Sequence, residues 1–329
     1  MQAAAAAKDP VAVILDCEIG RTPDNALTLA LLYALAYSEP AEAEFVSASL
    51  TRSSLQGAAF ADSVARFYTR HWLRDYPERY QRYRGLSPGL NDHDAPGESQ
   101  ALARALDRKT AEGATAYPHE IHDIFETADP LALIRNGLTG QPDGSAVVVL
   151  AGAATNLAGT LRLHGARELI RAKAALLVVA MDQEQISADL PAARKLFAEW
   201  PTPIIAVKPT QVRFPADLSF EWADSHPVGD ALSSSGSDFS TAGLAAALYA
   251  VRSDEASFEL SSGGELEIDE NGRVRLLETE GGDDRLLDAS NNDLATVYRE
   301  IITSEPAARE LPGFLKRRAE EEAKEKDKG

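Results

Sequence analysis

Three carboxylates and one amide lie within ten residues near the start of the chain: Asp16, Glu18, Asp24 and Asn25. The apolar run Val11–Leu15 before them is typical of a buried strand, so these side chains would gather at the carboxyl end of that strand. Oxygen atoms that converge there could hold a hard cation such as calcium, which takes about six to eight oxygen ligands. The alternative is helix capping, because Asp24 can lie in the first turn of a helix and offset its dipole.

Apolar runs and helical segments alternate along the chain. The predicted strands are Val11–Leu15, Phe45–Leu50, Ala146–Leu150, Ala174–Ala180 and Pro203–Val207. The predicted helices are Ala26–Ala36, Ala58–Tyr68, Ala128–Leu138, a helix from Asn156, and Pro191–Glu199. Strands that are apolar on both faces indicate an α/β fold with a mostly parallel sheet and helices on both faces. In such sheets ligands bind at the carboxyl ends of the strands.

The last third of the chain departs from this alternation. Phe258–Leu260, Glu265–Ile268 and Val274–Leu277 indicate a small antiparallel hairpin appendage with a turn at Asn271 and Gly272. We expect residues 1–315 to form one domain and residues 316–329 to be a charged tail, either a frayed helix or disordered.

Composition excludes several classes of function. The formal charge of -18 disfavours nucleic acid and anionic membranes as partners, and no apolar run approaches the roughly 20 residues of a membrane span. The single cysteine, Cys17, lies in an apolar run and is expected to be a buried, inert thiol. Met1–Ala7 lacks the features of a signal peptide; a secreted or periplasmic origin, with these residues left after cleavage, is a hypothesis.

Two groups of histidines offer other chemistry. His93 lies between two aspartates, and His119 and His122 are three residues apart, a spacing that one helical turn could bring to a metal. This differs from the four-residue spacing of the metalloprotease motif, and no further ligand is evident in the sequence. We therefore expect these histidines to lie on the surface or at the rim of a pocket.

The acidic cluster resembles the opening of the inosine-uridine-preferring nucleoside hydrolases, which in a longer variant reads Asp-Thr-Asp-Ile-Gly-Asn-Asp-Val-Asp-Asp-Ala-Leu. The matching positions are Asp16, Ile19, Gly20, Asp24, Ala26 and Leu27. Ala151–Ala158 is similar to the family's Gly-x-x-Thr-Asn-Leu-Ala element, and Asp189–Pro203 to its Asp-Pro-Glu-Ala-Ala helix and following strand. Ala245–Arg252 resembles the helix near the family's carboxyl end. Because these matches keep the family order, the resemblance implies a nucleoside hydrolase-like fold with a Rossmann-like core.

The resemblance also implies roles for individual residues. In that family calcium binds the ribose hydroxyls and lowers the pKa of the attacking water, while an aspartate takes the proton. Asp24 matches the ribose-binding aspartate, and Glu18 stands at the position of the metal ligand and general base. The resemblance therefore implies that Glu18 and Asp24 are the catalytic residues. The resemblance implies that Asp16, Glu18, Asn25 and the Thr155 backbone carbonyl form the metal set, and that Asn156, Gln183 and Gln185 bind substrate with Asp24.

Several positions depart from the family pattern. Asn25 replaces a bidentate calcium aspartate, and Gln183 and Gln185 stand where the family has Glu-x-Asn. The late metal aspartate falls on Gly243, and Asp238 would replace it only if its loop folded back. Calcium affinity depends on the number of charged ligands, so a calcium site would be weak or absent.

These replacements leave two functions open. One is calcium-dependent N-ribosyl hydrolysis of nucleosides or related ribosyl compounds, weakened or lost. The other is a noncatalytic homologue that binds a small molecule or acts as a scaffold. The resemblance also implies self-association, since family members are often dimers or tetramers.

Overall fold

The computed structural model describes residues 9–20, 24–76, 86–212, 218–233 and 239–309. Within these residues the main sheet has eight strands in the order β3-β2-β1-β4-β5-β6-β10-β7. The strands are β1 (Val11–Cys17), β2 (Ala43–Thr51), β3 (Gly89–Asn91), β4 (Ala146–Ala151), β5 (Ala174–Ala180), β6 (Ile204–Val207), β7 (Glu259–Leu260) and β10 (Arg285–Asp288). Neighbouring strands are parallel except β7, which runs antiparallel to β10.

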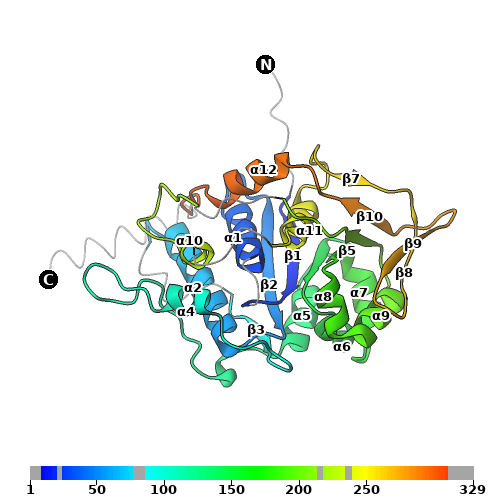
Figure 1. The fold of residues 1–329 in the computed structure, drawn as a ribbon, viewed down its shortest axis with the longest axis horizontal. Helices are drawn as coiled ribbons and strands as arrows, with labels where there is room; N and C mark the ends of the chain where they lie inside the picture. Colours follow the sequence, from blue (N-terminus) through cyan, green and yellow to red (C-terminus); the bar gives the residue numbers. More distant parts are fainter. Residues whose placement is uncertain (1–8, 21–23, 77–85, 213–217, 234–238, 310–329) are drawn as a thin grey trace, which may run out of the picture.

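Helices cover both faces of this sheet (Figure 1). They are α1 (Asp24–Ala36), α2 (Leu55–Trp72), α4 (Gln100–Leu106), α5 (Pro130–Thr139), α6 (Thr155–Thr160), α7 (Ala166–Lys173), α8 (Gln183–Ala188), α9 (Leu190–Glu199), α10 (Pro227–Ser233), α11 (Ala242–Val251) and α12 (Asp293–Ile302), with a short 3-10 helix at Ile124–Glu126. None of the helices in the described part of the chain is long and apolar enough to cross a membrane. The predicted α/β architecture is confirmed.

Alternating residues of β1 face the two helical layers. Val13, Leu15 and Cys17 belong to the apolar cluster shared with α1, α2, α11 and α12. Ile14 belongs to the opposite cluster, shared with α5, α6, α7 and α9. Asp16 is two residues after Ile14, so its side chain lies on the same face of the strand and points toward the α6 layer. Cys17 is fully buried, as predicted, and burial raises the pKa of its thiol.

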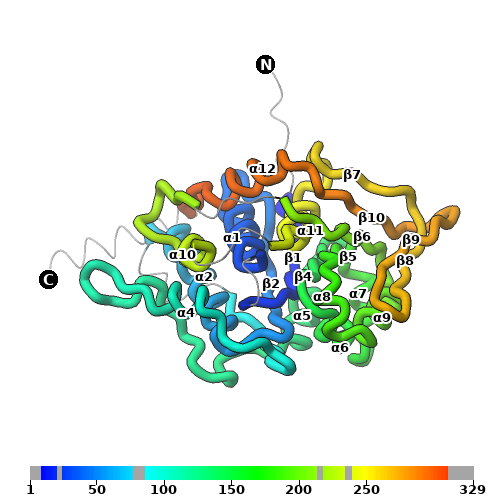
Figure 2. Tube along the Cα trace, viewed as in Figure 1, coloured from blue at the N-terminus to red at the C-terminus, as the bar shows by residue number. Residues whose placement is uncertain are grey.

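The chain returns repeatedly to the middle of the sheet, so residues far apart in sequence meet there. Figure 2 shows β1 next to β2 and β4 at the centre of the molecule, and the register pairs Asp16 with Ser49 on one side and Leu150 on the other. Because these strands are parallel, their carboxyl ends lie at the same edge. The loops that follow β1, β2 and β4 therefore define one side of the molecule.

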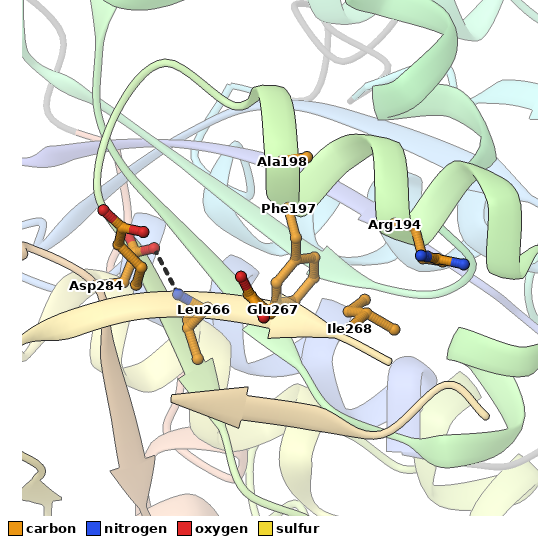
Figure 3. Close-up of a pocket in the computed structure, with 8 residues that line it drawn as sticks. Arg194, Phe197, Ala198, Leu266, Glu267, Ile268 and Asp284 are labelled. Carbon is orange, nitrogen blue, oxygen red and sulfur yellow. Dashed lines mark hydrogen bonds between the residues drawn. The ribbon is translucent and has the colours of Figure 1, made fainter. Parts of the chain in front are cut away.

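The predicted hairpin is confirmed in β8 (Gly264–Ile268) and β9 (Val274–Glu278), which pair antiparallel. Leu266 and Ile268 are buried in the cluster that includes Phe197 of α9, and with Phe197 and Arg194 they line a cavity of about 570 Å³ (Figure 3). The Asp284 carboxylate accepts hydrogen bonds from the backbone N–H groups of Ile204 and Leu266, which ties the hairpin to the sheet.

One part of the hairpin prediction is wrong. Glu259 and Leu260 form β7, the edge strand of the main sheet, where Leu260 pairs with Leu287 of β10. β10 was not predicted, because its four residues carry only a short apolar pair between Arg285 and Asp288.

Beside α2, His226 lies in a cluster of aromatic rings. Its ring stacks on Phe220 with centroids 3.7 Å apart, and Nδ1 accepts a hydrogen bond from the Val228 N–H at 3.2 Å. Burial, with a smaller contribution from His71, holds the pKa of His226 well below its ordinary value of 6.5. The imidazole is therefore neutral in the folded protein, whereas it binds a proton below about pH 6.5 in the unfolded chain.

We predict that the free energy of unfolding falls as the pH drops below 6.5, and that this fall is shallower in His226→Asn. The asparagine oxygen can accept the Val228 N–H but does not titrate. Chemical denaturation at several pH values measures the slope. His164→Asn, at an exposed histidine, is the control. Parallel slopes in the parent and His226→Asn would contradict the prediction.

Candidate functional site

Asp16 lies under α6 and not at the open end of the sheet. It is 0% exposed, and Oδ1 accepts hydrogen bonds from Ser49 Oγ and Asn156 Nδ2, each at 2.9 Å. Oδ2 has no hydrogen-bond partner within the described residues. Burial raises the pKa of Asp16 to about 7, although these two hydrogen bonds act in the opposite direction. The arrangement suits a structural link between β1, β2 and α6.

Asn156 completes this link. Its Nδ2 also donates to Leu50 O at 3.3 Å, and its Oδ1 accepts a hydrogen bond from Asn91 Nδ2 at 3.0 Å. Both amide hydrogens therefore already have protein acceptors, and the side chain joins β1, β2 and β3. The predicted role of Asn156 in substrate binding remains a prediction.

Glu18 and Asp24 lie at the carboxyl end of β1, each 4% exposed. Glu18 follows the strand, and its N–H donates to Ala151 O at 3.3 Å, so it is held beside the end of β4. Asp24 is in the first turn of α1, where a carboxylate offsets the helix dipole. Both carboxylates, after burial and Asp16, help to raise the pKa of the Cys17 thiol. The structure thus brings together two acidic side chains that the sequence placed at one strand end.

Asn25 occupies the centre of this strand-end site. Its Nδ2 donates to Glu18 O at 2.8 Å and to Ala151 O at 2.7 Å, and the residue is 1% exposed. Only the nitrogen of the amide can satisfy two carbonyl acceptors at once, which fixes the orientation of the side chain. The amide therefore joins the end of β1, the end of β4 and the start of α1.

Gly243, at the start of α11, packs directly against this amide. A Cβ at position 243 would lie 2.8 Å from Asn25 Oδ1 and 3.2 Å from Thr28 Oγ1. Oδ1 is buried and has no hydrogen-bond partner within the described residues. A side chain longer than hydrogen at position 243 would require Asn25 or Thr28 to move. Asp238, the alternative ligand, lies outside the described residues.

Among the described residues, the groups at this strand end do not form a ready set of calcium ligands. The place that a cation would take between the Glu18 and Ala151 carbonyls is filled by a hydrogen-bond donor, Asn25 Nδ2. Gly243 offers no side-chain ligand, and Asp16 Oδ1 already accepts hydrogen bonds from Ser49 and Asn156. Within the described residues no group of three or more His, Cys, Asp or Glu side chains is arranged to hold a metal ion.

The two glutamines of α8 point in different directions. Gln185 is buried, and its Nε2 donates to Ala151 O at 3.2 Å, the same carbonyl that Asn25 contacts. Gln183 is exposed, and its Nε2 donates to Ser187 Oγ and to Gly272 O in the hairpin turn. The structure therefore brings Gln185, but not Gln183, to the site.

Thr155 begins α6 and has its own partner. Its Oγ1 donates to Asp189 Oδ2 at 2.7 Å. The carbonyl that meets Asn25 belongs to Ala151, four residues earlier in the chain. This contact was not predicted, since a backbone carbonyl gives no signal in a sequence.

The loop after β2 supplies two serines beside the site, Ser53 and Ser54. Ser53 is 0% exposed, and its Oγ accepts from the Ile19 N–H at 2.9 Å and donates to Thr51 O at 3.1 Å. Ser54 caps α2 by accepting from the Gly57 N–H. Both serines hold the backbone around the site.

The histidine groups lie elsewhere. His93 is exposed and pairs with Asp94 at 3.0 Å, as expected for a surface residue. The rings of His119 and His122 are 4.9 Å apart, and burial, followed by the effect of His122, lowers the pKa of His119. Neither group belongs to a three-ligand cluster within the described residues.

Comparison with known proteins supports the fold assignment. No protein-family model matches the chain, and no curated protein matches it. Among solved structures, a purine-preferring ribonucleoside hydrolase from Gardnerella vaginalis has a TM-score of 0.58 at 16% identity, covering 89% of this chain and 98% of that one. The inosine-uridine-preferring nucleoside hydrolase from Bacillus anthracis has a TM-score of 0.58 at 13% identity, covering 90% and 99%.

A third similar structure is the type III effector XopQ, solved in complex with adenosine diphosphate ribose. It has a TM-score of 0.56 at 13% identity and covers 89% of this chain and 93% of that one. At these identities the comparisons show that the chain has a nucleoside hydrolase-like fold.

Proposed function

We propose that this protein binds a nucleoside or related ribosyl compound at the carboxyl ends of β1 and β4, and that N-ribosyl hydrolysis is weakened or lost. One observation carries the proposal: Glu18 and Asp24 remain buried at the strand ends, while the Asn25 amide stands between the two carbonyls where a cation would be expected. The nucleoside hydrolase-like fold and the location of the site support a ribosyl ligand.

The carboxylates suit the hydroxyls of a sugar. Ionised carboxylates are acceptors only, and hydrogen bonds to charged groups are stronger than neutral ones. They would also stabilise positive charge that develops on the sugar ring as a glycosidic bond breaks. The site thus retains groups for binding and for charge stabilisation.

Activation of water is the step that this site supports least. Without a cation, a water molecule depends on a carboxylate such as Glu18 to take its proton, and each loss of about 1.4 kcal/mol lowers the rate tenfold. The geometry therefore favours a binding protein with slow or absent turnover over an efficient hydrolase.

We predict that chelator-treated protein binds ribose and inosine, and that Asp24→Asn weakens this binding about tenfold to a hundredfold, because a hydrogen bond to a charged group is lost. Calorimetric titration measures the affinity, and chromatography of free base measures turnover in the same samples.

The matched control is Asp293→Asn, which changes an exposed aspartate in the first turn of α12. It separates an effect on a helix dipole from an effect on a ligand. Equal ribose affinity in the parent and Asp24→Asn, or no binding of either compound up to millimolar concentration, would contradict the proposal. Rapid release of base in chelator would contradict the loss of turnover.

A further inference from the structure

Arg52 lies directly after β2, at the edge of the sheet that carries the site. Its φ of 48° is in the left-handed region, which costs a non-glycine residue about 1 kcal/mol or more. Its Nη1 donates to Ala188 O, at the end of α8, at 3.1 Å. The side chain thereby joins the loop after β2 to the helix after β5, and these lie on either side of the β1 and β4 ends.

Among the described residues, no carboxylate pairs with the guanidinium of Arg52. Arg66 pairs with Asp62 and Glu120, and Arg252 pairs through two nitrogens with Glu42. In contrast, no carboxylate within the described part of the chain lies at ion-pair distance from the partly buried Arg52, and its Nε is buried without a hydrogen-bond partner there.

A guanidinium without a carboxylate partner retains N–H donors that could bind an anion. It carries five N–H groups in a planar arrangement that matches the oxygens of a phosphate, and one of its nitrogens is used by Ala188. The chain has 51 acidic and 33 basic residues, so most arginines could find a carboxylate partner. An arginine at this edge of the sheet without one among the described residues is therefore notable.

We propose that Arg52 binds the phosphate of the ligand, so that the site takes a phosphorylated ribosyl compound, of the class of ribose 5-phosphate or a nucleoside monophosphate. This inference rests on the proposed ribosyl site. Glu18 and Asp24 would repel a phosphate but accept hydrogen bonds from sugar hydroxyls, whereas Arg52 attracts the phosphate. In this arrangement Glu18 and Asp24 would hold the sugar and Arg52 the phosphate.

Calorimetric titration of the full chain with ribose, ribose 5-phosphate and inorganic phosphate tests this inference. We expect ribose 5-phosphate to bind at least tenfold more tightly than ribose. Arg52→Met should abolish this preference while the affinity for ribose is retained. Arg52→Lys, which retains the charge without the planar donors, should keep part of it and guards against a folding defect in the methionine variant.

Arg285→Met is the matched control. Arg285 lies on β10, away from the site, is also partly buried, and donates to one backbone carbonyl, that of Ser261. It should leave the preference unchanged. Equal affinity for ribose and ribose 5-phosphate, or an unchanged preference in Arg52→Met, would overturn the inference and leave the ribosyl site standing. Arg52-dependent binding of inorganic phosphate alone would support the anion site and overturn the ribosyl function. No binding of any of the three would overturn both.

Discussion

Asn25→Asp is expected to be strongly destabilised in the presence of a chelator and to recover stability when calcium is added. In the parent the amide nitrogen donates to two carbonyl oxygens at 2.7 and 2.8 Å. A carboxylate oxygen in that place would face two acceptors in a residue that is 1% exposed, and an uncompensated buried charge costs about 3–5 kcal/mol. Thermal unfolding in chelator and in millimolar calcium measures both effects.

Calcium should rescue the variant, because a divalent cation can then lie among the oxygens that the amide nitrogen had satisfied. The same addition should leave the Tm of the parent unchanged. The control is Asn271→Asp, the same substitution at an exposed turn residue. A parent whose own Tm rises with calcium, or an Asn25→Asp variant as stable as the parent in chelator, would show that the amide does not take the place of a cation.

The core of the fold was predictable because buried parallel strands are apolar on both faces. Ala174–Ala180 matches β5 in both bounds, and Ala146–Leu150 differs from β4 by one residue. The same signal fails at the edge of the sheet. Both residues of β7 are exposed, and the four residues of β10 are too few to show a periodic pattern.

The centre of the site was predictable because its acidic residues and amide follow one strand. Glu18, Asp24 and Asn25 are close in sequence, so the end of β1 and the start of α1 bring them together. Gln183 and Gln185 could not be separated in this way. Two residues apart on a helix differ by about 200° in direction, and the six residues of α8 do not show which side is inward.

Other features of the site depend on the tertiary structure. The Ala151 carbonyl carries no sequence signal, although it accepts hydrogen bonds from Asn25 and Gln185. Arg52 was missed because a charged residue in a loop is usually solvated. Ser49 gave a weak signal as a polar residue in an apolar run, and the strand register places it opposite Asp16.

The second large effect is expected from Asp16. The free energy of unfolding of the parent should fall relative to that of Asp16→Asn as the pH rises from about 4 to about 7, and the difference should then level off. The carboxyl has a pKa of about 7 in the folded protein against 3.8 in a model compound. Between these values the unfolded chain releases the proton while the folded protein retains it, so rising pH favours unfolding by up to about 4 kcal/mol.

Denaturant unfolding of the parent and Asp16→Asn across this pH range measures the effect. Asparagine retains an oxygen that can accept from Ser49 and Asn156 but has no proton to lose, so any constant offset reports hydrogen bonding and only the slope reports ionisation. Asp293→Asn, at an exposed site, controls for the loss of a carboxyl. Parallel curves for the parent and Asp16→Asn would mean that Asp16 ionises in the folded protein as readily as in the unfolded chain. A parent curve that falls relative to that of Asp16→Asn up to about pH 7 would instead identify Asp16 as a buried link that is weakened when its proton is lost.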